Sequence, residues 1–122
     1  MRPDVRFHVL ATKGGAALAI GPGKMALLEA IAATGSISAA ARSLGMSYRR
    51  AWMLVDETNR CLAQPAVATA TGGEGGGGAA LTEFGAAFIA TYRAIERDAR
   101  ASVDAKLAPF LGHVPPRATR RR

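Results

Sequence analysis

The segment from Ser47 to Arg50, Ser-Tyr-Arg-Arg, gathers side chains that can bond to a nucleic acid. An arginine can donate two parallel hydrogen bonds to a guanine edge, whereas serine hydroxyls and helix N-termini suit phosphate oxygens. Ser47 is a favoured N-cap residue, so Arg49 and Arg50 are expected on the first turn of a helix, where base edges are reached. This position favours DNA contact by at least one of the two arginines over an ordinary solvated helix face.

The helices on either side of the turn before this segment have the pattern of a helix-turn-helix. Ser36 can cap a first short helix, and Gly45 stands where a helix end favours a left-handed residue. A second helix is expected from Ser47 to about Ala63. Small residues such as Ala41 lie where the two backbones approach, as a steep helix crossing requires.

Helical periodicity divides these two helices into buried and open faces. The first helix is predicted to turn inward Ile37, Ala40, Ala41 and Leu44. The second helix is predicted to bury Ala51, Leu54, Val55, Thr58 and Leu62. Its opposite face, which is left free to touch a partner, carries Arg49, Arg50, Met53, Asp56, Glu57 and Arg60.

Three further side chains of the second helix can be interpreted individually. Trp52, the only tryptophan, is expected to anchor the helix internally with its N–H bonded inside the protein. Cys61, the only cysteine, is expected to be a small buried hydrophobic residue. Tyr48 could pack across the helix start or offer its hydroxyl to a phosphate, and the sequence favours neither.

The segments before the helix-turn-helix predict a hairpin and one more helix. Residues 5–20 alternate like a β-hairpin around the turn Lys13-Gly14-Gly15. A helix then begins at Pro22 and stops near Gly35, because proline suits the first helical turn and glycine ends it. Its apolar stripe is predicted to comprise Met25, Leu27, Leu28, Ile31 and Ala32.

The segments after the helix-turn-helix predict a second hairpin and a long helix. Two short strands flank a glycine-rich turn at residues 72–78, and a helix of about 24 residues follows the N-cap residue Thr82. Its apolar stripe is predicted to comprise Phe84, Ala87, Phe88, Thr91, Ile95, Ala99 and Val103. Three helices, a hairpin and a last helix predict a mainly α fold with small β-hairpins, a winged helix-turn-helix.

Length and composition agree with one folded, DNA-binding domain. The chain has 122 residues and a formal net charge of +7, of which four charges come from arginines in the last six residues. Residues 1–112 are expected to form the winged helix-turn-helix domain, and residues 113–122 a basic disordered tail. No apolar run is long enough to span a bilayer, so the protein is expected to be soluble and cytoplasmic, with no membrane partner.

Catalysis, cofactor binding and metal binding find little support in the sequence. His8 and His113 have no nucleophile or carboxylate at a telling spacing, so no catalytic residue is expected. The match to GxGxxG at Gly73, Gly75 and Gly78 is almost unavoidable in so glycine-rich a run, and no helix follows it directly. We therefore expect no enzyme, no cofactor and no metal, and interpret the run as the tip of the wing; whether the tip touches DNA stays open.

These motifs together resemble a known family. The run LLEAIAATGSISAAARSLGMSYRRAWMLVDETNR, followed by a strand and GGEGGGGAALTEFG, is similar to the N-terminal DNA-binding domain of ModE-type molybdate-responsive transcription regulators, a LysR-like winged helix-turn-helix. The similarity covers roughly residues 5–105. It implies a homodimer that binds a palindromic operator in double-stranded DNA, with the first strand and the last helix helping to form the dimer.

The resemblance also implies a set of contact residues and a biological setting. Carried over onto this sequence, the DNA-contacting residues are Ser36, Ser38, Ser47, Tyr48, Arg49 and Arg50. The targets are expected to concern molybdenum metabolism. Full-length members also carry molybdate-binding domains, for which residues 1–122 offer no counterpart, so the protein is expected either to act constitutively or to work with a separate effector-binding subunit. The alternative function is a protein-interaction module that uses the same fold to bind a partner chain.

Overall fold

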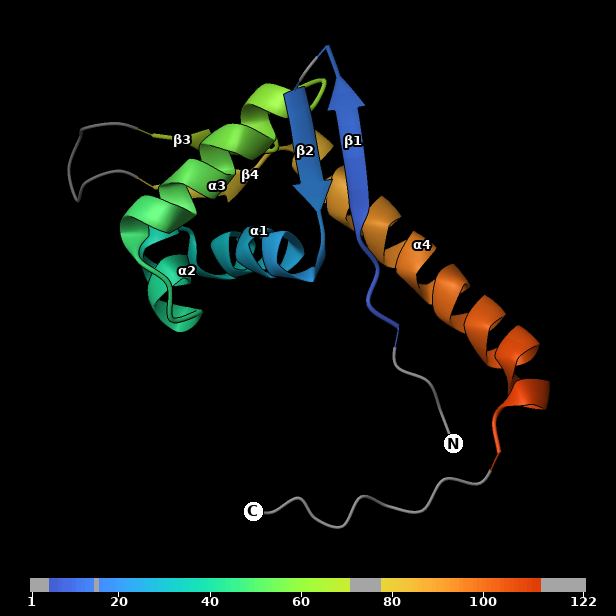
Figure 1. Ribbon diagram of the computed structural model, residues 1–122. Helices are drawn as coiled ribbons and strands as arrows, with labels where there is room; N and C mark the ends of the chain where they lie inside the picture. The colour runs from blue at the N-terminus through green and yellow to red at the C-terminus, as the bar shows by residue number, and fades with distance from the viewer. Residues whose placement is uncertain (1–4, 15, 71–77, 113–122) are drawn as a thin grey trace.

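The computed structural model describes residues 5–14, 16–70 and 78–112 (Figure 1). Two two-stranded antiparallel sheets accompany the helices of this part of the chain. In chain order the elements are β1 (Val9–Lys13), β2 (Ala16–Ile20), α1 (Pro22–Thr34), α2 (Ile37–Ser43), α3 (Tyr48–Cys61), β3 (Val67–Thr69), β4 (Ala79–Leu81), α4 (Glu83–Leu107) and a final 3-10 turn (Ala108–Phe110). The predicted winged helix-turn-helix architecture, mainly α with small hairpins, is confirmed.

Helix α1 forms the centre of the core, because it packs against α2, α3, α4 and the wing strand β4. Contacts from several directions bury a wide part of its surface, including Met25, Leu27, Leu28 and Ile31. Ala32, which was also predicted on the apolar stripe, is exposed in the last turn of the helix. The core is therefore built around one helix rather than between two layers.

Serine and threonine side chains start the next helices as the sequence predicts. The Ser36 hydroxyl accepts a hydrogen bond from the Ala39 amide at 3.0 Å, and the Thr82 hydroxyl accepts one from the Gly85 amide at 2.9 Å. Gly45 has a φ of 69°, the left-handed conformation expected in the turn between α2 and α3. Local chemistry thus fixes where these helices begin and end.

Helix α2 buries Ile37, Ala40 and Ala41 against the core, as predicted. Leu44, which was predicted to point inward with them, is exposed instead. The helix ends at Ser43, so Leu44 is its C-cap residue and lies at the edge of the turn rather than on the buried face.

The N-terminal hairpin is shorter than predicted. Its strands pair from Val9 opposite Ile20 to Lys13 opposite Ala16, whereas residues 5–8 belong to neither strand. Phe7 packs instead on α4, with its ring centroid 5.5 Å from that of Tyr92, whose hydroxyl donates a hydrogen bond to the Phe7 carbonyl. Tertiary contact with α4 thus replaces the strand pairing expected for these residues.

Asn59 of α3 is hydrogen-bonded to the start of the wing. The Asn59 amide nitrogen donates to the Val67 carbonyl at 2.9 Å, and its oxygen accepts from the Ala66 and Val67 amides at 2.8 and 3.1 Å. Strands β3 and β4 pair with Val67 opposite Leu81, which confirms the second hairpin. Its predicted glycine-rich tip falls largely on residues 71–77, and the predicted tail on residues 113–122, both outside the described residues.

The buried face of α4 differs from the predicted apolar stripe. The residues that α4 buries are Gly85, Ile89 and Tyr92, whereas Ile95 and Ala87 are exposed. Gly85 explains why α4 is rotated about its axis relative to the prediction, because a Cβ there would lie only 2.1 Å from the Ala66 carbonyl oxygen. The absence of a side chain at this position lets α4 approach the backbone before β3 closely.

An ion-pair network fixes α4 on α1. Arg93 donates from Nε and Nη2 to the two carboxylate oxygens of Glu29 at 3.0 and 2.6 Å, and from Nη1 to Glu96 at 2.8 Å. These hydrogen bonds raise the pKa of the Arg93 guanidinium above its ordinary value. The C-terminal part of α4 extends away from the other helices (Figure 1). Among the described helices, none combines the length and apolar character needed to cross a bilayer.

Candidate nucleic-acid interface

The N-terminal end of α3 lies open at the surface. The Ser47 hydroxyl accepts a hydrogen bond from the Arg50 amide at 3.0 Å and so caps the helix. Ser47, Tyr48, Arg49 and Arg50 are all exposed, with 56% of the Tyr48 surface accessible. The segment therefore stands at the start of α3, as predicted, and none of its four side chains is taken up by the core.

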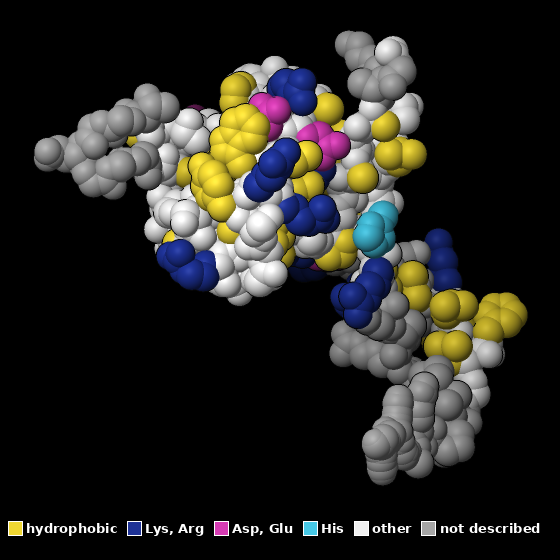
Figure 2. Space-filling model, turned by 60° about the vertical axis from the view of Figure 1, so that its left-hand side comes forward, with side chains coloured by type: hydrophobic (Ala, Val, Ile, Leu, Met, Phe, Trp, Pro, Cys, Tyr) yellow, Lys and Arg dark blue, Asp and Glu magenta, His cyan; other side chains and the backbone are white. Residues whose placement is uncertain are grey.

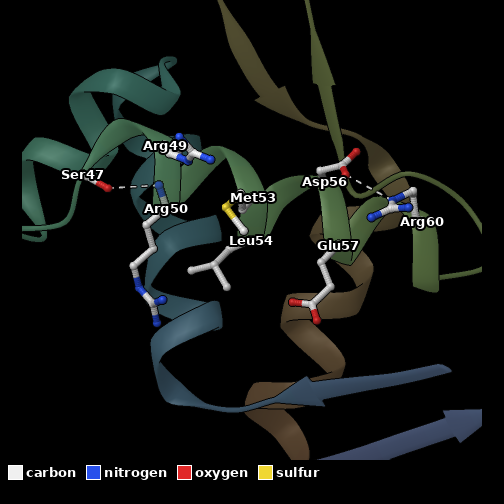
Figure 3. A pocket seen from close by; sticks show the side chains of 8 residues that line it. All are labelled: Ser47, Arg49, Arg50, Met53, Leu54, Asp56, Glu57 and Arg60. Carbon is white, nitrogen blue, oxygen red and sulfur yellow. Dashed lines mark hydrogen bonds and ion pairs between the residues drawn. The ribbon is translucent and has the colours of Figure 1, made fainter.

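The outer face of α3 surrounds a shallow depression of about 450 Å³, called here the α3 hollow (Figure 3). Its lining comprises Ser47, Arg49, Arg50, Met53, Leu54, Asp56, Glu57 and Arg60. All six residues predicted for the open face of this helix are among them. Figure 3 shows Arg49 and Arg50 at the N-terminal end of the hollow and Asp56, Glu57 and Arg60 toward the other end.

Ion pairs divide the charges of the α3 hollow into two groups. Asp56 accepts from Arg60 Nε at 3.1 Å, and Glu57 accepts from the α1 ammonium of Lys24 at 3.0 Å. In the described part of the chain, the guanidinium groups of Arg49 and Arg50 have no carboxylate partner. Both acidic groups are thus paired with a nearby cation, while the two arginines at the helix start are left to pair with an anionic partner.

The view in Figure 2, which brings forward the side carrying the start of α3, shows basic side chains standing among hydrophobic ones. Helix α2 contributes two more of the predicted contact residues next to this side. Ser36 is half-buried and engaged as an N-cap, whereas Ser38 is exposed on the first turn of α2. Neither lines the α3 hollow. The structure therefore gathers Ser47 to Arg50 in one place and holds Ser36 and Ser38 on a neighbouring helix.

Two predictions about single side chains of α3 are wrong. Trp52 is 47% exposed rather than an internal anchor, because Ala51 and Val55 fill the inner face and the next position points outward. Cys61, the last residue of the helix, is exposed and lines a depression together with residues of the N-terminal hairpin. The spacing of Ala51, Val55 and Thr58 already placed Trp52 off the buried face, so periodicity could have identified it as a surface residue.

Lys24 is the residue of this region that sequence reasoning missed. It is only 8% exposed, and its pairing with Glu57 connects α1 to the recognition helix across 33 positions of the chain. No local pattern marks such a contact. Within the described residues, no group of three or more histidine, cysteine or acidic side chains is arranged to hold a metal ion.

Comparison with known proteins agrees with this geometry. Residues 23–86 match the family described as bacterial regulatory helix-turn-helix protein, lysR family. The chain is 54% identical over 77 residues to the molybdenum-pterin-binding protein MopB of Rhodobacter capsulatus, and 38% identical over 91 residues to the molybdenum transport protein ModE of Azotobacter vinelandii. It is 45% identical over 71 residues to the DNA-binding transcriptional dual regulator ModE of Escherichia coli.

These matches cover 63%, 75% and 58% of this chain, but only 28%, 33% and 27% of the three relatives. The similarity to the DNA-binding part of ModE-type proteins that the sequence motifs indicated is confirmed. The family description and the Escherichia coli relative are those of regulators that bind DNA and not of enzymes. With more than half of its residues inside the matched region, the chain belongs to the lysR family of bacterial regulatory helix-turn-helix proteins.

Proposed function

We propose that this chain binds a specific palindromic sequence in double-stranded DNA as a homodimer and regulates transcription. The observation that carries the proposal is the pair Arg49 and Arg50 on the first turn of α3, exposed and without a carboxylate partner among the described residues. In winged helix-turn-helix domains this turn enters the major groove, and bidentate arginine contacts select guanine. Ser47 and Tyr48 stand beside them, where hydroxyl groups can bond to phosphate oxygens.

Ser36 and Ser38 complete the proposed contact set from helix α2. Ser38 is exposed and offers its hydroxyl from the first turn, where amide groups and the helix dipole favour a phosphate. Ser36 already accepts a hydrogen bond from the Ala39 amide, but its own hydroxyl proton remains available to an acceptor. Both serines fix the position of the protein on the backbone rather than select a base.

The second half of α4 supports the homodimer. Ile95 is 43% exposed and Phe110 is 82% exposed, and Leu107 is exposed between them. Ile95 and Leu107 belong to α4, and Phe110 belongs to the 3-10 turn that follows it. The C-terminal part of α4 extends beyond the other helices (Figure 1). Pairing with the same helix of a second copy would remove this apolar surface from water and would set two α3 helices at a fixed separation.

The relatives suggest the biological setting. Their names refer to molybdenum transport and molybdenum-pterin binding, so the proposed target operators belong to genes of molybdenum metabolism. The protein is proposed to bind these operators in the cytoplasm. The chain spans about a third or less of these relatives, and a separate effector-binding subunit that senses molybdate is proposed as a further partner. This chain would supply the DNA contact.

Selection of bound sequences from a random duplex pool tests the proposal. The pool is offered at near-physiological salt, with and without molybdate, and bound duplexes are sequenced. Enrichment of a palindrome supports a dimeric reader of sequence. Binding that is only salt-sensitive and enriches no sequence would overturn it, because phosphate attraction alone carries no sequence preference; the protein-interaction module would then be the better explanation of the fold.

A further inference from the structure

Exposed apolar side chains stand among the arginines on the outer part of α3. Tyr48, Trp52 and Met53 are 56%, 47% and 57% exposed, and the described part of the chain does not cover them. Water contact with so much apolar surface is unfavourable, and such surface commonly marks a contact site. Met53 is the member of this group that lines the α3 hollow.

The position of Met53 relative to Arg49 is set by the helix. Residues four apart lie on the same face and are separated by roughly 6 Å along the axis, less than two base-pair steps of about 3.4 Å. Figure 3 shows Met53 between the two arginines on one side and Asp56 and Glu57 on the other. When Arg49 reaches one base, Met53 therefore faces a neighbouring base pair.

The chemistry of the major groove offers one apolar group to such a side chain. Base edges present hydrogen-bond donors and acceptors there, and thymine alone adds a C5-methyl group. Methionine is long, unbranched and polarisable, so it adapts to an apolar contact at a site of this kind. It has no strong donor, and a contact with a polar base edge would leave that edge without its hydrogen bond.

The charges around Met53 favour DNA over a protein partner. Within residues 5–14, 16–70 and 78–112, Arg49 and Arg50 have no carboxylate partner, and the nearby carboxylates of Asp56 and Glu57 are each paired with a cation. Met53 also lines the hollow that already holds the proposed base-reading arginines. In DNA, the phosphate groups on either side of the major groove would supply the negative charge that these arginines lack.

We propose that Met53 is a specificity-determining residue that contacts a thymine C5-methyl group next to the base read by Arg49. The inference rests on the proposed function, since it requires a selected DNA sequence. It adds a readout by apolar contact to the hydrogen-bonding set of Ser36, Ser38, Ser47, Tyr48, Arg49 and Arg50.

A scan of deoxyuridine for thymidine in the selected duplex removes one methyl group at a time and leaves base pairing intact. With the unchanged protein, deoxyuridine at one position in each half-site is expected to weaken binding of the duplex about fourfold. This is the effect of losing roughly one buried methyl group. With Met53→Ala the same substitution should cost nothing, whereas Met53→Leu should retain most of the effect. Leu10→Ala, an exposed apolar change on β1, serves as the matched control and should retain all of it.

The outcomes separate this inference from the function on which it rests. A selected sequence in which uracil is tolerated everywhere, or in which Met53→Ala keeps the full methyl dependence, would overturn the role of Met53 and leave the proposed function intact. Failure to select any sequence would remove both. Because Met53 is more than half exposed, its substitution does not disturb the core, and thermal unfolding of the variant verifies this.

Discussion

Lys24 Nζ lies 3.0 Å from Glu57 Oε1, and this ion pair joins the central helix α1 to the recognition helix α3. The two ends of the pair differ in exposure, since the lysine side chain is 7% and the glutamate side chain 43% accessible. A largely buried ammonium group needs its partner more than an exposed carboxylate does. The pair therefore contributes both to stability and to the orientation of the face that holds Arg49 and Arg50.

Glu57→Gln is predicted to lower the free energy of unfolding by about 1 to 2 kcal/mol, because it leaves the Lys24 ammonium short of a charged partner. Lys24→Met in the same chain should restore most of that loss, since an apolar side chain suits the buried position. Asp56→Asn is the matched control, and at this exposed pair the change should stay within roughly 0.5 kcal/mol. Urea unfolding checks all three; equal effects at Glu57 and Asp56 would contradict the role given to burial.

Gly85→Ala is predicted to destabilise the fold by about 1 to 3 kcal/mol, because the new Cβ would clash with the Ala66 carbonyl oxygen. Gly23→Ala is the control in a helix whose glycine has open space around it, and it should be neutral or stabilising by up to about 1 kcal/mol. Thermal unfolding followed by circular dichroism compares the two. A Gly85→Ala protein as stable as the original would mean that α4 does not approach Ala66 so closely.

The serines of the proposed interface are predicted to separate into two kinds. Ser47→Ala removes the cap of α3 and should cost about 1 kcal/mol of stability as well as DNA affinity. Ser38→Ala should leave stability unchanged and weaken binding to all duplexes by roughly threefold to tenfold, as loss of a phosphate contact does. Unfolding curves and fluorescence-anisotropy titrations distinguish them. Unchanged affinity in Ser38→Ala would remove Ser38 from the contact set.

Ile95→Glu is predicted to weaken the proposed homodimer by roughly tenfold or more, because it places a charge in an apolar interface. Ala101→Glu, at an exposed position about 120° around α4 from Ile95, provides the matched control and should leave the dimer intact. Sedimentation equilibrium over a range of concentrations measures both. A monomeric starting protein, or a dimer that tolerates the change at Ile95, would refute the assignment of this surface.

Features set by neighbouring residues could be predicted from the sequence. The three capping side chains, the left-handed Gly45 and the second hairpin each depend on a few adjacent positions. For the same reason the start of α3 and the six residues of its open face were predicted correctly. Periodicity and capping were sufficient there because α3 is amphipathic.

Features set by tertiary packing were predicted less well. The rotation of α4 depends on the close approach of Gly85 to Ala66, and an apolar stripe in the sequence does not reveal it. Phe7 was predicted to lie in a strand but packs on Tyr92, which is 85 positions away in the sequence. Likewise the contact of Lys24 with Glu57 has no local signal, so the support of the recognition helix by α1 became visible only in the structure.

The most direct test of DNA reading by α3 compares the double variant Arg49→Ala, Arg50→Ala with Arg97→Glu. Both variants change the net charge by the same amount, but Arg97 lies exposed on α4. Affinities for the selected duplex and for a scrambled duplex are measured at several salt concentrations. The double variant is expected to lose about tenfold to a hundredfold in the preference for the selected duplex, while Arg97→Glu weakens both duplexes alike. A double variant that keeps the full preference would contradict sequence reading by Arg49 and Arg50.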